Sequence, residues 1–179
     1  MWKQIRSLAR SFRFAGKGFW WMLTRERNFR IHLTCLAYML FFLLRYDFFV
    51  LSRTDLALLL LAASAVIANE MINTGIEKAD DTVTLEQRTT IAISKDVAAG
   101  GVLVSAIAAV GVGICVLWQP KAFAALYHYY AGHLISLALL LLSFVPALWF
   151  IFRFGRKTAA ADTKPAPEES PEKQEKETK

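Results

Sequence analysis

Four apolar blocks decide which fold class this sequence can adopt. They cover residues 33–51, 56–72, 97–118 and 134–152. A helix needs about 20 mainly apolar residues to cross a bilayer, and these blocks approach or reach that length. The chain is 55% hydrophobic and only 20% charged, which is too apolar for an ordinary soluble domain. The sequence therefore predicts an all-α membrane protein with several spans.

The N-terminal residues 1–30 hold a strong excess of positive charge. Eight Lys and Arg residues stand there against Glu26 alone. The first five, from Lys3 to Lys17, recur every three or four residues beside an apolar stripe. This pattern predicts an amphipathic helix over residues 2–21 that lies in the membrane interface, followed by a polar linker to residue 30. Binding of nucleic acid is disfavoured because aromatic residues interleave with the charges and a span follows at once.

The expected spans are residues 31–50, 55–79, 95–118 and 133–152, the last kinked at Pro146. We expect a loop over 80–94, an outer loop over 119–132 and a disordered charged tail over 158–179. The third span is rich in small residues, which suits close helix packing. Lys and Arg gather on the side of the termini, so both termini are expected in the cytoplasm, and the protein in the cytoplasmic membrane. Cys35 and Cys115 are interpreted as packing residues.

The second apolar block runs without a turn residue into a row of polar side chains. The helical rise places Glu70 about 21 Å along the helix from Leu56, inside a hydrocarbon layer that is about 30 Å thick. Spacings of three, four and four residues place Glu70, Asn73, Glu77 and Asp81 on one face. An ionisable group within a span is costly and indicates function. The alternative, that Glu70 only ends the span, is disfavoured because the helical periodicity continues beyond it.

Carboxylates at this depth can do chemistry on a lipid headgroup. One at the lipid–water boundary can accept a proton from a lipid hydroxyl, and one nearer the cytoplasm can hold a divalent metal. Glu26, Lys95 and Asp96 are expected at the same interface. A snorkelling lysine and a helix-capping aspartate are the commoner roles for the last two. We interpret their convergence as a site between a lipid and a metal-bound soluble molecule.

Three segments carry a resemblance to a known family. They are RERNFRIH at 25–32, NEMINTGIEKADD at 69–81 and KDVAAGGVLVSAI at 95–107. In this order they resemble the integral-membrane diacylglycerol kinase and undecaprenol kinase family of prokaryotes, over about residues 10–118. The resemblance implies a homotrimer with three spans per chain and an active site shared between subunits. The chain has no GxxxxGK[ST] loop and no HRD or DFG set of the soluble kinases.

The resemblance also implies roles for individual residues. Glu70 matches the general base, and Glu26 and Glu77 match the residues that bind Mg²⁺ on the phosphates of the co-substrate ATP. The remaining nucleotide-binding positions and their supports would be Phe14, Lys17, Asn73, Asp81, Lys95 and Asp96. The lipid substrate is expected to be undecaprenol, since RERNFRIH and KDVAAGGVL look more like the Gram-positive-type members. Diacylglycerol, converted to phosphatidic acid, is the alternative.

Some features depart from the family pattern. Gly75 and Lys78 stand where Ala and an apolar residue are usual, and the fourth span lies outside the family core. We expect that span to add contacts and no chemistry. Two other functions stay open: a subunit of an ion path, and a non-catalytic scaffold that recruits a partner through its tail. An ion path is disfavoured because it should place polar groups deep in spans one, three and four, and the interiors of these spans hold only Cys, Ser, Thr and Tyr as polar residues.

Overall fold

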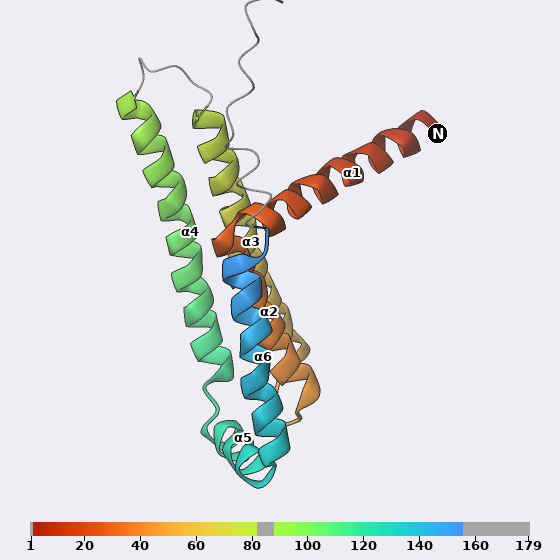
Figure 1. The fold of residues 1–179 in the computed structure, drawn as a ribbon, viewed down its shortest axis with the longest axis vertical. Helices are drawn as coiled ribbons and strands as arrows, with labels where there is room; N and C mark the ends of the chain where they lie inside the picture. Colours follow the sequence, from red (N-terminus) through yellow and green to blue (C-terminus); the bar gives the residue numbers. More distant parts are fainter. Residues whose placement is uncertain (1, 82–87, 156–179) are drawn as a thin grey trace, which may run out of the picture. The chain divides into compact units, whose positions relative to one another are not determined.

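The computed structural model describes residues 2–81 and 88–155, and within these ranges the chain is all-α as predicted. These described residues form two compact units, one of α1 with residues 153–155 and one of residues 26–152. The helices are drawn in Figure 1 and are α1 (Trp2–Arg25), α2 (Arg27–Arg45), α3 (Arg53–Asp80), α4 (Arg88–Leu117), α5 (Pro120–Gly132) and α6 (Leu134–Arg153).

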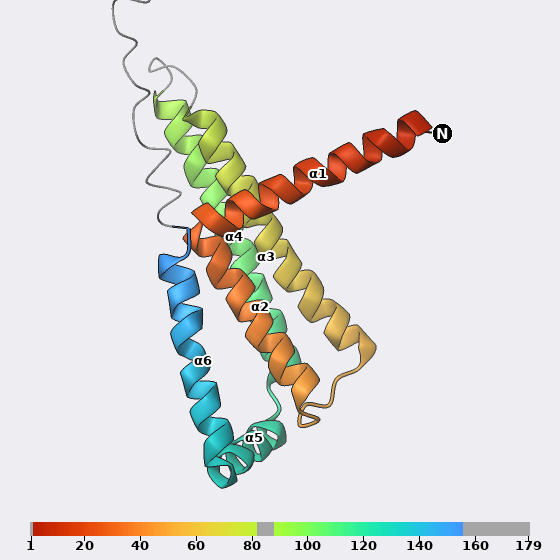
Figure 2. The same cartoon turned by 45° about the vertical axis from the view of Figure 1, so that its right-hand side comes forward.

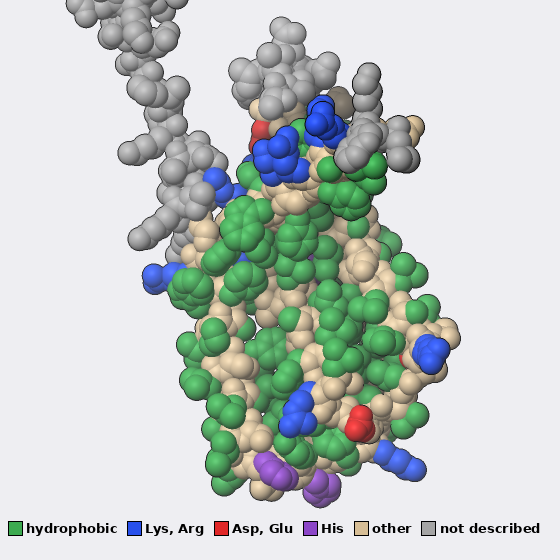
Figure 3. All heavy atoms as spheres, turned by 90° about the vertical axis from the view of Figure 1, so that its right-hand side faces the viewer, with side chains coloured by type: hydrophobic (Ala, Val, Ile, Leu, Met, Phe, Trp, Pro, Cys, Tyr) green, Lys and Arg blue, Asp and Glu red, His purple; other side chains and the backbone are tan. Residues whose placement is uncertain are grey.

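The second unit is an antiparallel helical bundle. α3 packs chiefly along α4 and also against α2, as both Figure 1 and Figure 2 show. α5 runs across one end of the bundle, and α6 returns beside α2 toward the other end. Hydrophobic side chains dominate the face seen in Figure 3, and only scattered charged side chains interrupt them. This distribution is the one expected of a bundle that sits in a bilayer.

α3 begins with a capping box. The Asp55 amide donates to Ser52 Oγ at 3.1 Å and the Ser52 amide donates to Asp55 Oδ2 at 2.8 Å, which satisfies two N–H groups at the start of the helix. The helix starts at Arg53, close to the predicted residue 55. Its buried side chains form one stripe: Leu59, Val66, Glu70, Asn73 and Thr74. The stripe is apolar in its first half and polar in its second.

Three helices of the described residues are long and apolar enough to cross a membrane, namely α3, α4 and α6. α2 is not among them, because its first two turns carry Arg27, Arg30 and His32. The predicted span over 31–50 was placed too late in the chain. The helix begins at Arg27 and ends at Arg45, and residues 46–52 form a turn in which the Tyr46 amide still caps Phe42 O.

Several predicted boundaries were wrong. α1 extends to Arg25, and only Glu26 separates it from α2. α4 begins at Arg88, which shortens the predicted loop over 80–94. Residues 82–87 of that loop lie outside the described residues. The predicted disordered tail also lies outside them. The predicted outer loop over 119–132 is instead α5, which starts with Pro120 in the first helical turn, where a proline is pre-organised for the helix.

The glycines of α4 lie beside open space, although α4 itself packs along α3. No atom lies within 4 Å of the position that a Cβ would take at Gly100, Gly101, Gly111 or Gly113. These glycines therefore leave space on α4 that is not filled within one chain.

α6 is attached to α2 at two levels. Arg30, only 5% exposed, donates from Nε to the Ile151 carbonyl at 3.0 Å, and Ile151 belongs to the last turn of α6, where carbonyls lack helical partners. Nearer the middle, the Tyr38 hydroxyl and Ser143 Oγ are 2.8 Å apart. The helix remains continuous through Pro146. The added helix thus makes specific contacts with α2, which agrees with its expected role.

In the first unit, α1 is exposed along most of its length, and Trp20 is 61% exposed. α6 ends at Arg153, one residue after the predicted end of the last span. Gly155 then takes a left-handed conformation with φ of 74°. Its Cα lies so close to the Thr24 carbonyl that a Cβ would overlap it. Only glycine fits this turn.

Candidate functional site

Glu70 is the most buried carboxylate of the predicted set. It is 4% exposed and faces the first turn of α2, where the Asn28 side chain is hydrogen-bonded to its carboxyl group. The carboxylates that act on it most strongly are those of Glu26 and Glu77. The structure therefore brings these three predicted residues together within one chain. Burial of a carboxylate is tolerated where hydrogen bonds replace water, and Asn28 provides one.

Glu26 lies at the junction where α1 ends and α2 begins. It is the N-cap residue of α2, with an extended backbone at φ −99° and ψ 117°, yet its side chain makes no capping hydrogen bond. Its carboxylate is thus left available beside the positive end of the α2 dipole, a position that favours negative charge.

Asn73 and Glu77 form a pair one turn beyond Glu70. Asn73 Nδ2 donates to Glu77 Oε1 at 2.9 Å, so the carboxylate is held toward the stripe. Asn73 itself is buried, and its Oδ1 atom has no hydrogen-bond partner among the described residues. A buried amide oxygen without a partner indicates a place where a ligand or an ion supplies the missing contact.

A Mg²⁺ ion fits these donors. Mg²⁺ prefers oxygen ligands and is usually held by one or two carboxylates together with waters and substrate phosphates. Glu26 and Glu77 are two such carboxylates whose charges act on Glu70. Asn73 Oδ1 is a further oxygen, one turn from Glu77 on α3. Within residues 2–81 and 88–155 no group of three or more His, Cys, Asp or Glu side chains is close enough to enclose a metal. The donor set thus suits an ion whose remaining ligands are phosphate oxygens of a nucleotide.

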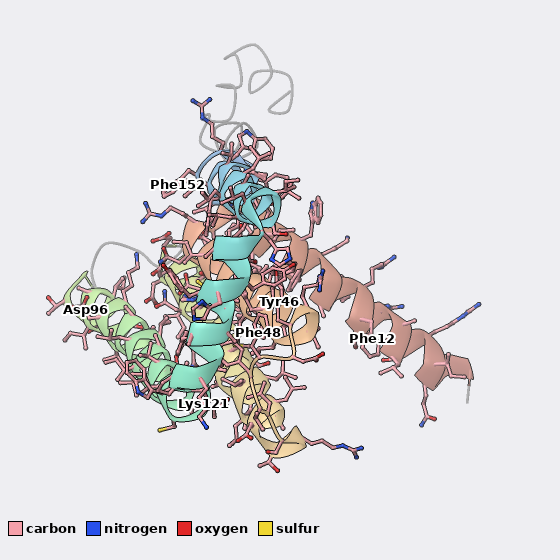
Figure 4. All side chains as sticks on the ribbon, turned by 90° about the horizontal axis from the view of Figure 1, so that it is seen from below. Phe12, Tyr46, Phe48, Asp96, Lys121 and Phe152 are labelled. Carbon is pink, nitrogen blue, oxygen red and sulfur yellow. The ribbon has the colours of Figure 1, made fainter. Side chains whose placement is uncertain are left out.

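An ion pair between Asp81, at the end of α3, and Lys95 connects α3 to α4. Lys95 Nζ donates to Asp81 Oδ1 at 2.6 Å, and Lys78 Nζ lies 3.8 Å from the other carboxylate oxygen. The carboxylates of Asp80 and Glu77 also interact electrostatically with Lys95. Lys95 therefore lies near the carboxylates of α3. Asp96 is exposed on the side of α4 away from α3 (Figure 4) and forms no hydrogen bond or ion pair with the rest of the described chain.

Phe14 and Lys17 belong to the first unit and are neighbours on α1. The Phe14 ring is 56% exposed and lies 6.0 Å from Lys17 Nζ and 5.7 Å from the Arg13 guanidinium. Such an exposed ring under two cations can stack on a planar group. The structure does not group these two residues with Glu70, which lies in the second unit.

Sequence reasoning missed three residues of the site region. Asn28 holds Glu70, Thr74 is 3% exposed beside Asn73, and Arg30 fixes the end of α6. A signal for the first existed: Asn28 stands two residues after Glu26 in the RERNFRIH motif, within the first turn of a predicted helix. Thr74 was part of the quoted family pattern but received no role.

Glu26, Glu70 and Glu77 thus gather between the start of α2 and the second half of α3, in a unit whose helices include candidate membrane spans. A family model described as prokaryotic diacylglycerol kinase matches residues 13–117, and the chain belongs to this family of lipid kinases. The resemblance inferred from the sequence is confirmed. α5 and α6 lie outside the matched residues.

Two relatives illustrate the similarity. The chain is 38% identical over 121 residues to a protein of Synechocystis sp. (strain ATCC 27184 / PCC 6803 / Kazusa) named diacylglycerol kinase, covering 66% of this chain and 67% of that protein. It is 29% identical over 120 residues to a Bacillus subtilis (strain 168) protein named undecaprenol kinase, covering 66% of this chain and 93% of the relative. No solved structure matches the chain significantly. A kinase of this family uses a nucleotide and a lipid.

The ion pair of Asp81 generates a prediction on pH. The hydrogen bond and charge of Lys95 hold the pKa of Asp81 below its usual value. A depressed pKa in the folded state means that the ion pair is present at neutral pH and is lost as pH falls through that pKa. In Lys95→Met we expect the pKa of Asp81 to rise toward its usual value, as followed by the ¹³C shift of labelled aspartate carboxyls.

Lys78→Met is the control, because Lys78 is farther from Asp81 and contributes less. An Asp81 titration that is the same in Lys95→Met as in the unaltered protein would contradict the ion pair.

Proposed function

We propose that the chain transfers the γ-phosphoryl group of ATP to the hydroxyl of a membrane lipid alcohol at the cytoplasmic face of the membrane. The observation that supports this most is the position of Glu70, a buried carboxylate fixed by Asn28 between two further carboxylates. Glu70 stands in the second half of α3, where the buried stripe changes from apolar to polar side chains. A lipid headgroup meets water at such a boundary.

In the proposed reaction Glu70 accepts the proton of the lipid hydroxyl. The hydroxyl oxygen then bonds to the γ-phosphorus of ATP while the bond from that phosphorus to the β–γ bridging oxygen breaks, and ADP leaves. Phosphoryl transfer demands mainly positioning and charge neutralisation. The hydrogen bond from Asn28 supplies the first, because it fixes the carboxyl group of Glu70 relative to α2.

Glu26 and Glu77 would hold Mg²⁺, with Asn73 keeping Glu77 in place. When bound, the metal neutralises charge on the phosphates. Lys95 would contact the nucleotide, and Asp81 would orient the Lys95 ammonium group through their 2.6 Å hydrogen bond. Asp96, Phe14 and Lys17 are proposed as further nucleotide contacts.

Undecaprenol is the proposed substrate, on the strength of the RERNFRIH and KDVAAGGVL segments. Diacylglycerol is the second candidate. It is favoured by the relative named diacylglycerol kinase, which is 38% identical, against 29% for the relative named undecaprenol kinase. Both lipids present a hydroxyl to Glu70, so the proposed chemistry is the same for either.

The first test of this function is transfer of labelled phosphate from ATP to undecaprenol and to diacylglycerol in mixed micelles. We expect transfer to undecaprenol, reduced at least about 100-fold in Glu70→Gln, because a general base contributes about 10²–10⁴-fold. Asp47→Asn is the matched control, since it removes an exposed carboxylate at the other end of the bundle.

Transfer to diacylglycerol alone would replace undecaprenol as the substrate. Equal turnover in Glu70→Gln and the unaltered protein would exclude Glu70 as the base. A protein that consumes no ATP with either lipid, and binds none, would overturn the kinase proposal for this chain.

A second prediction concerns the metal. Glu77→Gln keeps an oxygen that can accept from Asn73 Nδ2 but removes a charge that would hold Mg²⁺. We expect the Mg²⁺ concentration for half-maximal turnover to rise about tenfold or more, while Asp47→Asn leaves it unchanged. An identical Mg²⁺ dependence in Glu77→Gln would remove Glu77 from the metal site.

We also propose that three copies assemble and that both termini lie in the cytoplasm, with α2 as a further span. The exposed apolar faces of α4 and α6 allow contacts between chains, and four spans return the chain to its starting side. Native mass spectrometry should then give the mass of three chains. Tags at the two ends should be digested from the same face of sealed inverted vesicles; tags digested from opposite faces would contradict this orientation.

A further inference from the structure

A cavity of about 510 Å³ opens at the end of the second unit opposite to Glu70. α2, α5 and α6 form its walls, and two of these helices lie outside the residues that match the family. Its volume is within the range of small-molecule and lipid sites in proteins. The proposed kinase reaction makes no use of this cavity.

Tyrosines build the rim of the cavity. The hydroxyls of Tyr46 and Tyr130 are 2.7 Å apart, and both residues are 8% exposed. Tyr46 stacks on Phe48 with 5.3 Å between the rings, and Figure 4 shows both rings beside α5. Gln119 ties the same turn to the start of α5, since it accepts from the Val50 amide at 3.0 Å and donates to the Val50 carbonyl at 3.1 Å. The rim is therefore fixed before any ligand binds.

Arg45 is the one charged residue that lines the cavity. Its guanidinium lies 5.3 Å from the centre of the Tyr46 ring. No carboxylate of the described residues forms an ion pair with it. A guanidinium presents several N–H donors in a plane and binds phosphate in a bidentate manner. An arginine without a carboxylate partner, held over an aromatic ring at the mouth of a cavity, is complementary to an anion.

The wall beyond Arg45 is apolar. Ala37 and Phe41 on α2 face Leu139 and Leu140 on α6 across the cavity. At the end farther from Arg45 the two helices meet, because the Tyr38 hydroxyl bonds to Ser143 and the Tyr38 ring stacks on Phe144 at 5.3 Å. The ligand must therefore be anionic at one end and apolar along its length.

We propose that this cavity binds an anionic phospholipid of the membrane leaflet opposite to the kinase site, with its phosphate on Arg45 and one acyl chain along the wall formed by α2 and α6. A phospholipid matches both the cationic and the apolar part of the cavity lining. The site is built largely from the helices that this chain adds to the family core.

The test is lipid retention by the full-length protein. Delipidated protein is mixed with phosphatidylglycerol or phosphatidylcholine of identical acyl chains, and bound lipid is counted by native mass spectrometry. We expect about one tightly held phosphatidylglycerol per chain and at least about tenfold weaker retention of phosphatidylcholine. Arg45→Gln should lose this preference. Lys121→Gln, which removes a cation from the same end of the bundle without lining the cavity, should keep it.

Leu139→Trp is the second variant, because it fills the apolar wall and leaves Arg45 in place. We expect it to lose retention of both lipids. Equal retention of the two lipids by the unaltered protein would overturn the proposal, as would an equal loss of preference in Lys121→Gln or unchanged retention in Leu139→Trp. A cross-link that places a second copy of the chain in the cavity would assign the wall to an interface instead.

Discussion

The burial of one carboxylate governs the arrangement of α2 and α3. Removing Glu70 from water costs several kcal/mol unless hydrogen bonds compensate, and at 4% exposure the compensation must come from the protein. It comes from Asn28, in the first turn of α2. The start of α2 must therefore lie against the second half of α3, and the break in the helix at Glu26 allows α2 to begin there. The other carboxylates of α3 are held by separate contacts, Glu77 by Asn73 and Asp81 by Lys95.

The second half of α3 is polar, and yet the helix does not end. Its buried stripe passes from Leu59 and Val66 to Glu70 and Asn73 without a change of face. The 3.6-residue period that packs the apolar part against the bundle therefore also aims the polar part at α2. The helical period of α3 therefore determines both how the helix packs in the bundle and where its carboxylates point. A change of register in α3 would displace the core and the carboxylates together.

Most of the fold could be predicted from the sequence, because four apolar blocks and their flanking charges report membrane helices directly. The carboxylate row on α3 could be predicted as well, since a spacing of three and four residues fixes a helical face. What escaped prediction depends on contacts between distant segments. The role of Asn28 follows only once α2 and α3 are known to lie side by side. The start of the first span was predicted too late because a helix end set by a single extended residue, such as Glu26, changes the hydrophobicity profile little. α5 was missed because a short aromatic helix between two spans resembles a loop in composition.

The bond between Arg30 and α6 has a consequence for how this chain can vary. Arg30 donates to the main-chain carbonyl of Ile151 and not to its side chain. A main-chain carbonyl is present whichever amino acid occupies the position. The residue of α6 at this contact can therefore be substituted without loss of the hydrogen bond, as long as α6 keeps its length. Position 30, in contrast, is constrained to the side chain that donates the bond. Among relatives that carry such a helix, we expect α6 to diverge in sequence and to conserve its length, with no covariation between residues 30 and 151.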